Sequence, residues 1–139
     1  MTTITAPPTT TTSAPAVQRL RTVLRVNAAT SLVAGTVGLL ATDSVVDELG
    51  VQSAGWTRLI SAGLVLFAID VVLGARSARH LANTALLTSV LDLAWVVATV
   101  AVLATVGLTG PGRFLAVVLG FAVLDFAVLQ LWLRGRMPR

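Results

Sequence analysis

Four apolar runs dominate this sequence, and each is long enough to cross a lipid bilayer as a helix. The hydrocarbon core of a bilayer is about 30 Å thick, which takes about 20 helical residues. The runs fall near residues 24–41, 59–75, 81–106 and 114–133. Only 12% of the 139 residues are charged, about half the share found in soluble domains. Because backbone polar groups in lipid must pair internally, we expect an all-α membrane protein with four transmembrane helices.

The arginines indicate which way these helices run. The chain has ten basic residues, all of them arginine. An excess of arginine marks the cytoplasmic side of a membrane protein. Two arginines, Arg58 and Arg113, lie in the first and third connections. The other eight lie before the first span, between the second and third, or after the fourth: Arg19, Arg21, Arg25, Arg76, Arg79, Arg134, Arg136 and Arg139. We therefore expect a multi-pass protein of the cell (inner) membrane with both termini in the cytoplasm. This distribution favours the lipid bilayer, and not nucleic acid, as the partner of the arginines.

The segments outside the spans are short. Residues 1–18 are rich in Thr, Pro and Ala, so we expect a disordered cytoplasmic tail ahead of a transmembrane domain over residues 19–139. The connection after the first span is acidic, and we expect a short helical turn there with Ser44 as its cap. The sequence Gly110-Pro111-Gly112 predicts a tight turn after the third span.

The second and fourth spans resemble each other at an offset of 55 residues. Arg58 and Asp70 of the second span match Arg113 and Asp125 of the fourth. The first and third spans align less cleanly, at an offset of 56 or 57 residues. The alignment predicts an internal repeat of two tandem hairpins with the same topology, related by an axis along the membrane normal.

Three aspartates, Asp70, Asp92 and Asp125, interrupt the apolar runs. A carboxylate in hydrocarbon is costly and needs a partner, a proton or a functional role. At 1.5 Å per residue, all three fall at a similar depth, somewhat to the cytoplasmic side of the midplane. We expect the carboxylates to meet, and at least one of them to be protonated unless a cation lies among them.

Helical spacing adds further residues to this centre. Thr88 and Trp95 lie on the same helical face as Asp92, and Asn27 opens a stripe of small and weakly polar residues on the first span. Arg25 and Asn27 are the nearest groups able to compensate a carboxylate. The predicted intramembrane polar centre therefore consists of Asp70, Asp92, Asp125, Asn27, Arg25, Trp95 and Thr88. In the alternative, the aspartates are separate, and each is hydrogen-bonded by a Thr, Ser or Asn of a neighbouring helix.

The residue types that carry most enzyme chemistry are scarce. The chain has no cysteine, and its one histidine, His80, lies at the edge of a span. Neither a metal-ligand pattern, a nucleophile–histidine set nor a phosphate-binding glycine loop occurs in the sequence. We expect no enzymatic activity, no metal and no cofactor. Two functions remain open: assembly or interaction as a helix bundle, in a homodimer or a larger membrane complex, or proton- or cation-coupled transport of a small solute by a carrier or pore that uses the aspartates.

A looser signal comes from the order of several short motifs. An Arg-flanked Asn27, an acidic loop that ends near Gly50, the run from Leu91 to Trp95 and the basic end at Arg134–Arg136 follow one another over residues 20–136. In this order they resemble a group of small uncharacterised four-helix membrane proteins from actinobacteria-like genomes. That resemblance implies a membrane fold and no known activity. The chain also has the size of the small multidrug-resistance transporters, but its first span lacks the acidic residue essential to them.

Overall fold

The structure, a computed structural model, describes residues 13–137 as a bundle of helices. Four of the helices, α1, α3, α4 and α5, are long and apolar enough to cross a membrane. This confirms the expected all-α fold with four candidate spans. In chain order the helices are α1 (Ser13–Leu40), α2 (Thr42–Leu49), α3 (Ala54–Arg76), α4 (Leu81–Thr105) and α5 (Gly110–Gly135).

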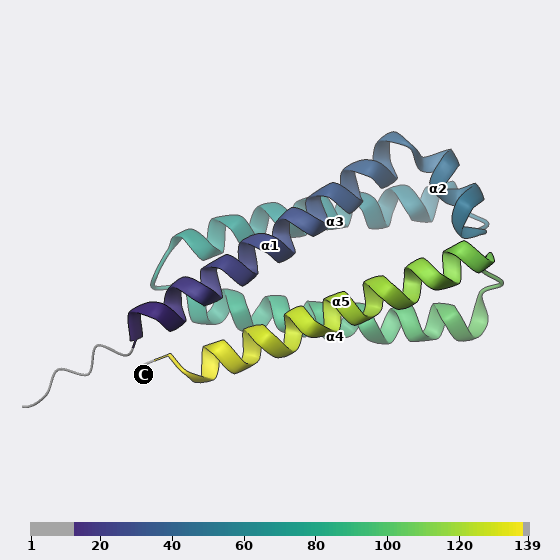
Figure 1. The fold of residues 1–139 in the computed structure, drawn as a ribbon. Helices are drawn as coiled ribbons and strands as arrows, with labels where there is room; N and C mark the ends of the chain where they lie inside the picture. Colours follow the sequence, from purple (N-terminus) through teal and green to yellow (C-terminus); the bar gives the residue numbers. More distant parts are fainter. Residues whose placement is uncertain (1–12, 138–139) are drawn as a thin grey trace, which may run out of the picture.

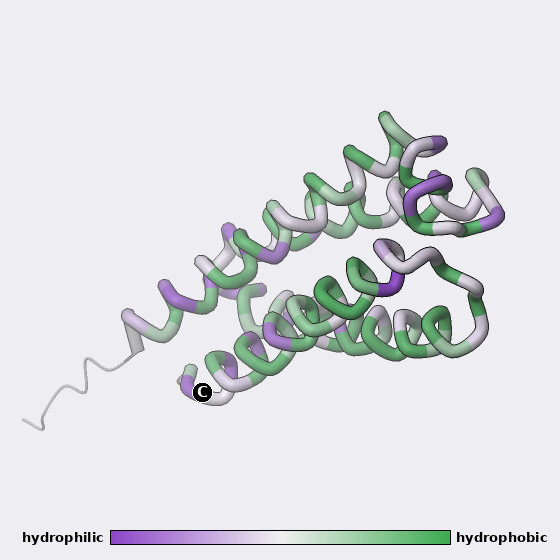
Figure 2. Tube along the Cα trace, turned by 45° about the vertical axis from the view of Figure 1, so that its right-hand side comes forward, coloured by the Kyte–Doolittle hydropathy of each residue, from purple (hydrophilic) through white to green (hydrophobic). Residues whose placement is uncertain are grey.

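The four long helices form two antiparallel pairs. Helix α1 packs mainly on α3, and α4 packs mainly on α5 (Figure 1). The pairs meet where α1 contacts α5 and α3 contacts α4, whereas α3 and α5 lie diagonally and do not touch. The start of α1 and the end of α5 lie at the same end of the bundle, and the short α2 lies at the other (Figure 1). Hydrophilic residues concentrate at these two ends, and mostly apolar stretches lie between them (Figure 2).

Small residues bring α1 and α3 close together. Gly35 and Gly38 of α1 face Ser61 of α3, and a Cβ atom added at Gly35 would lie 2.6 Å from the Ser61 carbonyl oxygen. Such close approach is typical of membrane helices, which associate through packing because lipid is as apolar as their side chains. Nearer the end that carries the termini, a cluster of apolar side chains closes the bundle: Leu20, Leu24, Ala28, Ala68, Val71, Ala75, Leu81, Ala85 and Leu133.

Helix α1 begins earlier than the sequence predicted. It starts at Ser13, so the expected disordered tail over residues 1–18 is wrong for residues 13–18, and residues 1–12 lie outside the described part of the chain. Pro15 is compatible with this start, because the first turn of a helix needs no backbone N–H donor. Val17 packs against the apolar cluster and gives the added turn a tertiary contact.

Two connections also differ from expectation. Helix α2 begins after Ala41, so Ser44 lies inside its first turn and does not cap it. Residues 110–112 are not a separate turn but the first turn of α5: Thr109 is the N-cap, and its Oγ1 accepts a hydrogen bond from the Gly112 amide at 3.0 Å. The same hydroxyl donates to the Glu48 carbonyl oxygen. One threonine therefore starts α5 and ties it to the end of α2.

Candidate functional site

A network of buried polar side chains connects three of the four long helices. Asp92 of α4 lies at its centre, and its Oδ2 atom accepts two hydrogen bonds. Asn27 Nδ2 of α1 donates at 2.8 Å, and Gln130 Nε2 of α5 donates at 3.2 Å. These three side chains are at most 5% exposed. The network therefore crosses the interface between the two helix pairs.

Ser89 extends the network along α4. Its hydroxyl lies 2.8 Å from the Ala85 carbonyl oxygen and 3.3 Å from Gln130 Oε1. The hydroxyl has a single hydrogen, so the two oxygens share or compete for one donor. Gln130, which is fully buried, thus contacts Asp92 with its amide nitrogen and Ser89 with its amide oxygen. These two contacts fix the orientation of its side chain.

The helical spacing of small and polar residues builds this site. On α4, Ala85, Thr88, Ser89 and Asp92 are all buried, and their spacing of three and four residues places them on one face. Ala28 of α1 and Ala127 of α5 are also buried in the bundle. These small side chains leave room for the longer amides of Asn27 and Gln130 to reach the carboxylate between the helices.

The network contains one carboxyl group and no cation. Arg25, which the sequence suggested as a compensating group, is exposed on α1. It lies only two residues from Asn27, a rotation of about 200° on a helix, so the two side chains leave opposite sides of α1. The donors to Asp92 are therefore uncharged amides.

Asp70 and Asp125 lie elsewhere. Both are exposed, and they belong to α3 and α5, the two helices that do not touch each other. The structure therefore does not bring the three carboxylates into one centre, contrary to the sequence-based hypothesis. The alternative of separate, hydrogen-bonded aspartates describes Asp92, but its two amide partners include Gln130, which the hypothesis did not name.

The remaining predicted residues, Thr88 and Trp95, differ in how deeply they are buried. Thr88 is buried one turn from Asp92, whereas Trp95 is half-buried. Ser89 and Gln130 were missing from the predicted site. Gln130 carried a usable signal, because it is the one amide side chain in the last apolar run and membrane helices seldom hold such a group without a partner.

Asp70 and Asp125 each lie in a stripe of exposed residues spaced four and three apart. We call these the α3 stripe and the α5 stripe. The α3 stripe consists of Leu59, Gly63, Leu66, Asp70 and Leu73, and the α5 stripe of Phe114, Val118, Phe121, Asp125 and Val128. This is the spacing by which one helix packs along another. Position by position, the two stripes are 55 residues apart, the same offset as the sequence alignment.

Known proteins offer no guide to the role of these residues. No protein-family model, curated protein or solved structure matches the chain.

Proposed function

We propose that this integral membrane protein functions by assembling with further copies of itself, through the α5 stripe as the first contact. The observation that carries the proposal is Asp125. It is exposed on a helix that is otherwise apolar enough to span the membrane. An aspartate at the centre of a membrane helix costs about 2.5–3.5 kcal/mol. A second copy that covers the stripe removes that contact with lipid.

The position of Asp125 favours a protein partner over water at the membrane surface. It lies ten residues from the end of α5 at Gly135 and fifteen from its start at Gly110, distances of about 15 Å and 22 Å along the helix. Asp70 is closer to a helix end, six residues or about 9 Å from Arg76. Its carboxylate therefore has the shorter path to water, and for this reason we assign the first contact to α5.

Two copies related by a two-fold axis along the membrane normal would run their α5 helices in parallel. Equivalent residues then lie at the same depth, so each Asp125 faces the Asp125 of its partner. One protonated carboxyl group can donate a hydrogen bond to the other, because two ionised carboxylates at close range repel each other. The apolar residues of the two stripes pack on either side of this pair.

We infer two further properties of this membrane protein. The first is an internal duplication of one hairpin, because the two stripes have the same spacing and lie on diagonal helices. The arginine-rich end of the bundle, which carries the start of α1 and the end of α5, favours a cytoplasmic location of both termini in the cell membrane.

Disulfide cross-linking tests the α5 contact directly, because the chain has no cysteine of its own. We expect the variant Phe121→Cys to form a disulfide-linked dimer in liposomes under mild oxidation. Leu131→Cys is the matched control: it is on the same helix and exposed (37%, against 64% for Phe121), but its side chain leaves the helix about 80° away from that of Phe121. We expect the control to stay monomeric at the same protein-to-lipid ratio.

The role of the aspartate is tested in the same background. Adding Asp125→Leu to Phe121→Cys removes both the carboxyl hydrogen bond and the cost of an aspartate in lipid, so we expect at least a tenfold drop in cross-linking, because each 1.4 kcal/mol is a factor of ten. The exposed Asp43 of α2 supplies the control Asp43→Leu, which should cross-link normally. Equal cross-linking of Phe121→Cys and Leu131→Cys, or no effect of Asp125→Leu, contradicts the proposal.

The buried Asp92 favours a second candidate, a proton- or cation-coupled carrier. A carboxyl group inside a membrane bundle, hydrogen-bonded from two helices, is a typical element of proton-coupled transport. If this candidate is correct, liposomes containing the protein should show a proton leak or uptake that depends on pH, and Asp92→Asn should abolish it while cross-linking through Phe121→Cys persists. No flux above that of empty liposomes in either protein rules the carrier out.

A further inference from the structure

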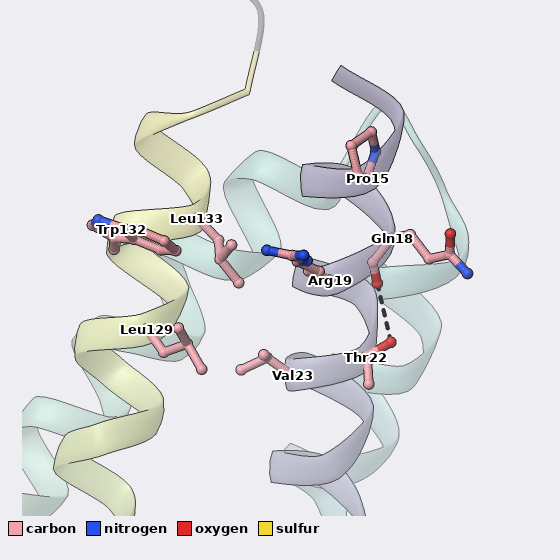
Figure 3. Close-up of a pocket in the computed structure, with 8 residues that line it drawn as sticks. All are labelled: Pro15, Gln18, Arg19, Thr22, Val23, Leu129, Trp132 and Leu133. Carbon is pink, nitrogen blue, oxygen red and sulfur yellow. Dashed lines mark hydrogen bonds between the residues drawn. The ribbon is translucent and has the colours of Figure 1, made fainter. Parts of the chain in front are cut away.

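A groove opens between α1 and α5 at the end of the bundle that carries both termini. Its volume is about 520 Å³, and its walls include Arg19 and Val23 from α1 and Leu129, Trp132 and Leu133 from α5 (Figure 3). The Arg19 side chain extends from α1 toward α5 and ends near Leu133 (Figure 3). One turn deeper, Val23 and Leu129 face each other (Figure 3). The groove is thus cationic at its outer edge and apolar below.

A second guanidinium group contacts Trp132, one of the residues that line the groove. The Arg136 side chain stacks on the Trp132 ring, with its central carbon 3.6 Å from the ring centroid. Stacking uses the flat face of the guanidinium and leaves the N–H groups along its edge able to bind oxygen atoms. Arg19 and Arg136 are both exposed, so both can meet a ligand from outside the bundle.

The depth of these groups matches the layers of a phospholipid leaflet. The candidate span of α1 runs from Pro15 to Leu40, about 39 Å, whereas the hydrocarbon core is about 30 Å thick. If the core is centred on this helix, about 4.5 Å protrudes at each end, so Arg19, about 6 Å from Pro15, lies at the boundary of the core and its long side chain can reach the headgroups. Val23 lies a turn deeper, where acyl chains begin. Tryptophan is also enriched at this boundary.

We propose that this groove binds one anionic phospholipid. The phosphate lies between Arg19 and Arg136, and an acyl chain runs along Val23, Leu129 and Leu133. Arginine binds phosphate oxygens with two parallel N–H groups, and basic pockets between membrane helices are suited to anionic headgroups. The groove adjoins the end of the α5 stripe, because Trp132 follows Val128 by four residues, but its test measures lipid preference and not assembly, so the two proposals can fail separately.

Native mass spectrometry of the detergent-purified protein tests the proposal, with phosphatidylglycerol and phosphatidylcholine of identical acyl chains as the probes. We expect the wild-type protein to retain phosphatidylglycerol in preference to phosphatidylcholine. Each arginine near a membrane surface accounts for roughly a fivefold change in binding. Arg19→Gln and Arg136→Gln should therefore each weaken phosphatidylglycerol binding about fivefold, and the double variant should bind both lipids alike.

Arg113→Gln is the matched control, because Arg113 is exposed at the opposite end of α5; it should leave the preference unchanged. Leu129→Trp fills the apolar part of the groove and should reduce binding of both lipids. Competition with inorganic phosphate tells whether the site recognises a phospholipid or only a phosphate group. If it recognises only the phosphate group, millimolar inorganic phosphate should displace the lipid. If it recognises the phospholipid, the lipid should stay bound.

The proposal is wrong if wild-type protein binds the two lipids equally, if free phosphate displaces the lipid, or if the double variant retains the phosphatidylglycerol preference. Helical circular dichroism of each variant, compared with wild type, shows that a lost preference is not a loss of fold. Because the arginines are exposed, we expect all four arginine variants, including the double variant, to keep the wild-type spectrum.

Discussion

Replacing Gly35 by alanine is expected to destabilise the bundle by about 1–3 kcal/mol, the usual cost of forcing extra atoms into a closely packed site. The added Cβ atom would lie 2.6 Å from the Ser61 carbonyl oxygen and 2.9 Å from Val65 Cγ2. The first of these is backbone, which cannot rotate away as a side chain can. Relief therefore requires the backbones of α1 and α3 to move apart near Gly35. Thermal unfolding in detergent, followed by tryptophan fluorescence, measures the effect.

Alanine favours a helix more than glycine does, so two other glycine-to-alanine changes in the same helices serve as controls for this gain in helix propensity. A Cβ atom at Gly38 would meet the Ser61 hydroxyl, which is able to rotate, and one at Gly63 would meet no atom within 4 Å. We therefore expect the loss of thermal stability to decrease from Gly35→Ala to Gly38→Ala, with Gly63→Ala at least as stable as wild type. A Gly35→Ala protein that unfolds at the wild-type temperature would show that the two helices do not approach as closely as described.

Replacing Asp92 by leucine is also expected to lower the stability of the bundle substantially. Leucine has a similar shape, but it leaves the amide donors of Asn27 and Gln130 without their acceptor in a buried site. An unsatisfied buried donor costs about 1–3 kcal/mol, and polar contacts between membrane helices average about 0.6 kcal/mol. Two lost contacts therefore predict a decrease of about 1–3 kcal/mol in the free energy of unfolding.

Asparagine at the same position separates the hydrogen bonds from the charge. The Oδ1 atom of Asp92→Asn can accept from both amides, so we expect this variant to stay much closer to wild type than Asp92→Leu. Guanidinium or dodecyl sulfate titrations of the three proteins compare their free energies of unfolding. If Asp92→Leu proves as stable as Asp92→Asn, the hydrogen bonds do not hold α1 and α5 to α4, and the network has no structural role.

The sequence predicted the helices well because length and apolarity alone define a membrane span. It was less informative about where they begin. A turn of α1 forms over Pro15, where Val17 packs against the apolar cluster, most of whose members belong to other helices. Likewise, Thr109 caps α5 through atoms that also bind the end of α2, so residues 110–112 become helical although their composition indicates a turn.

The candidate site was predictable where several polar residues share one face. Thr88 and Asp92 marked the buried face of α4 correctly, and Asn27 was correctly placed beside it. Asp70 and Asp125 were misplaced because a lone polar residue in an apolar helix does not tell whether its face meets the same chain or another one. A face that packs inside the bundle and a face that contacts another chain have the same helical spacing, and only the packing of the four helices distinguishes them.

The buried network also sets an order for the synthesis of the protein. Asn27 is made 65 residues before its acceptor, Asp92. At about 5–20 residues per second, its amide is synthesised roughly 3 to 13 s before that acceptor. During this interval the first hairpin has no internal partner for the amide and must rely on water, lipid headgroups or the insertion machinery. The second hairpin therefore completes the first, and a chain shortened before α4 would leave the Asn27 amide dependent on water, lipid headgroups or another protein.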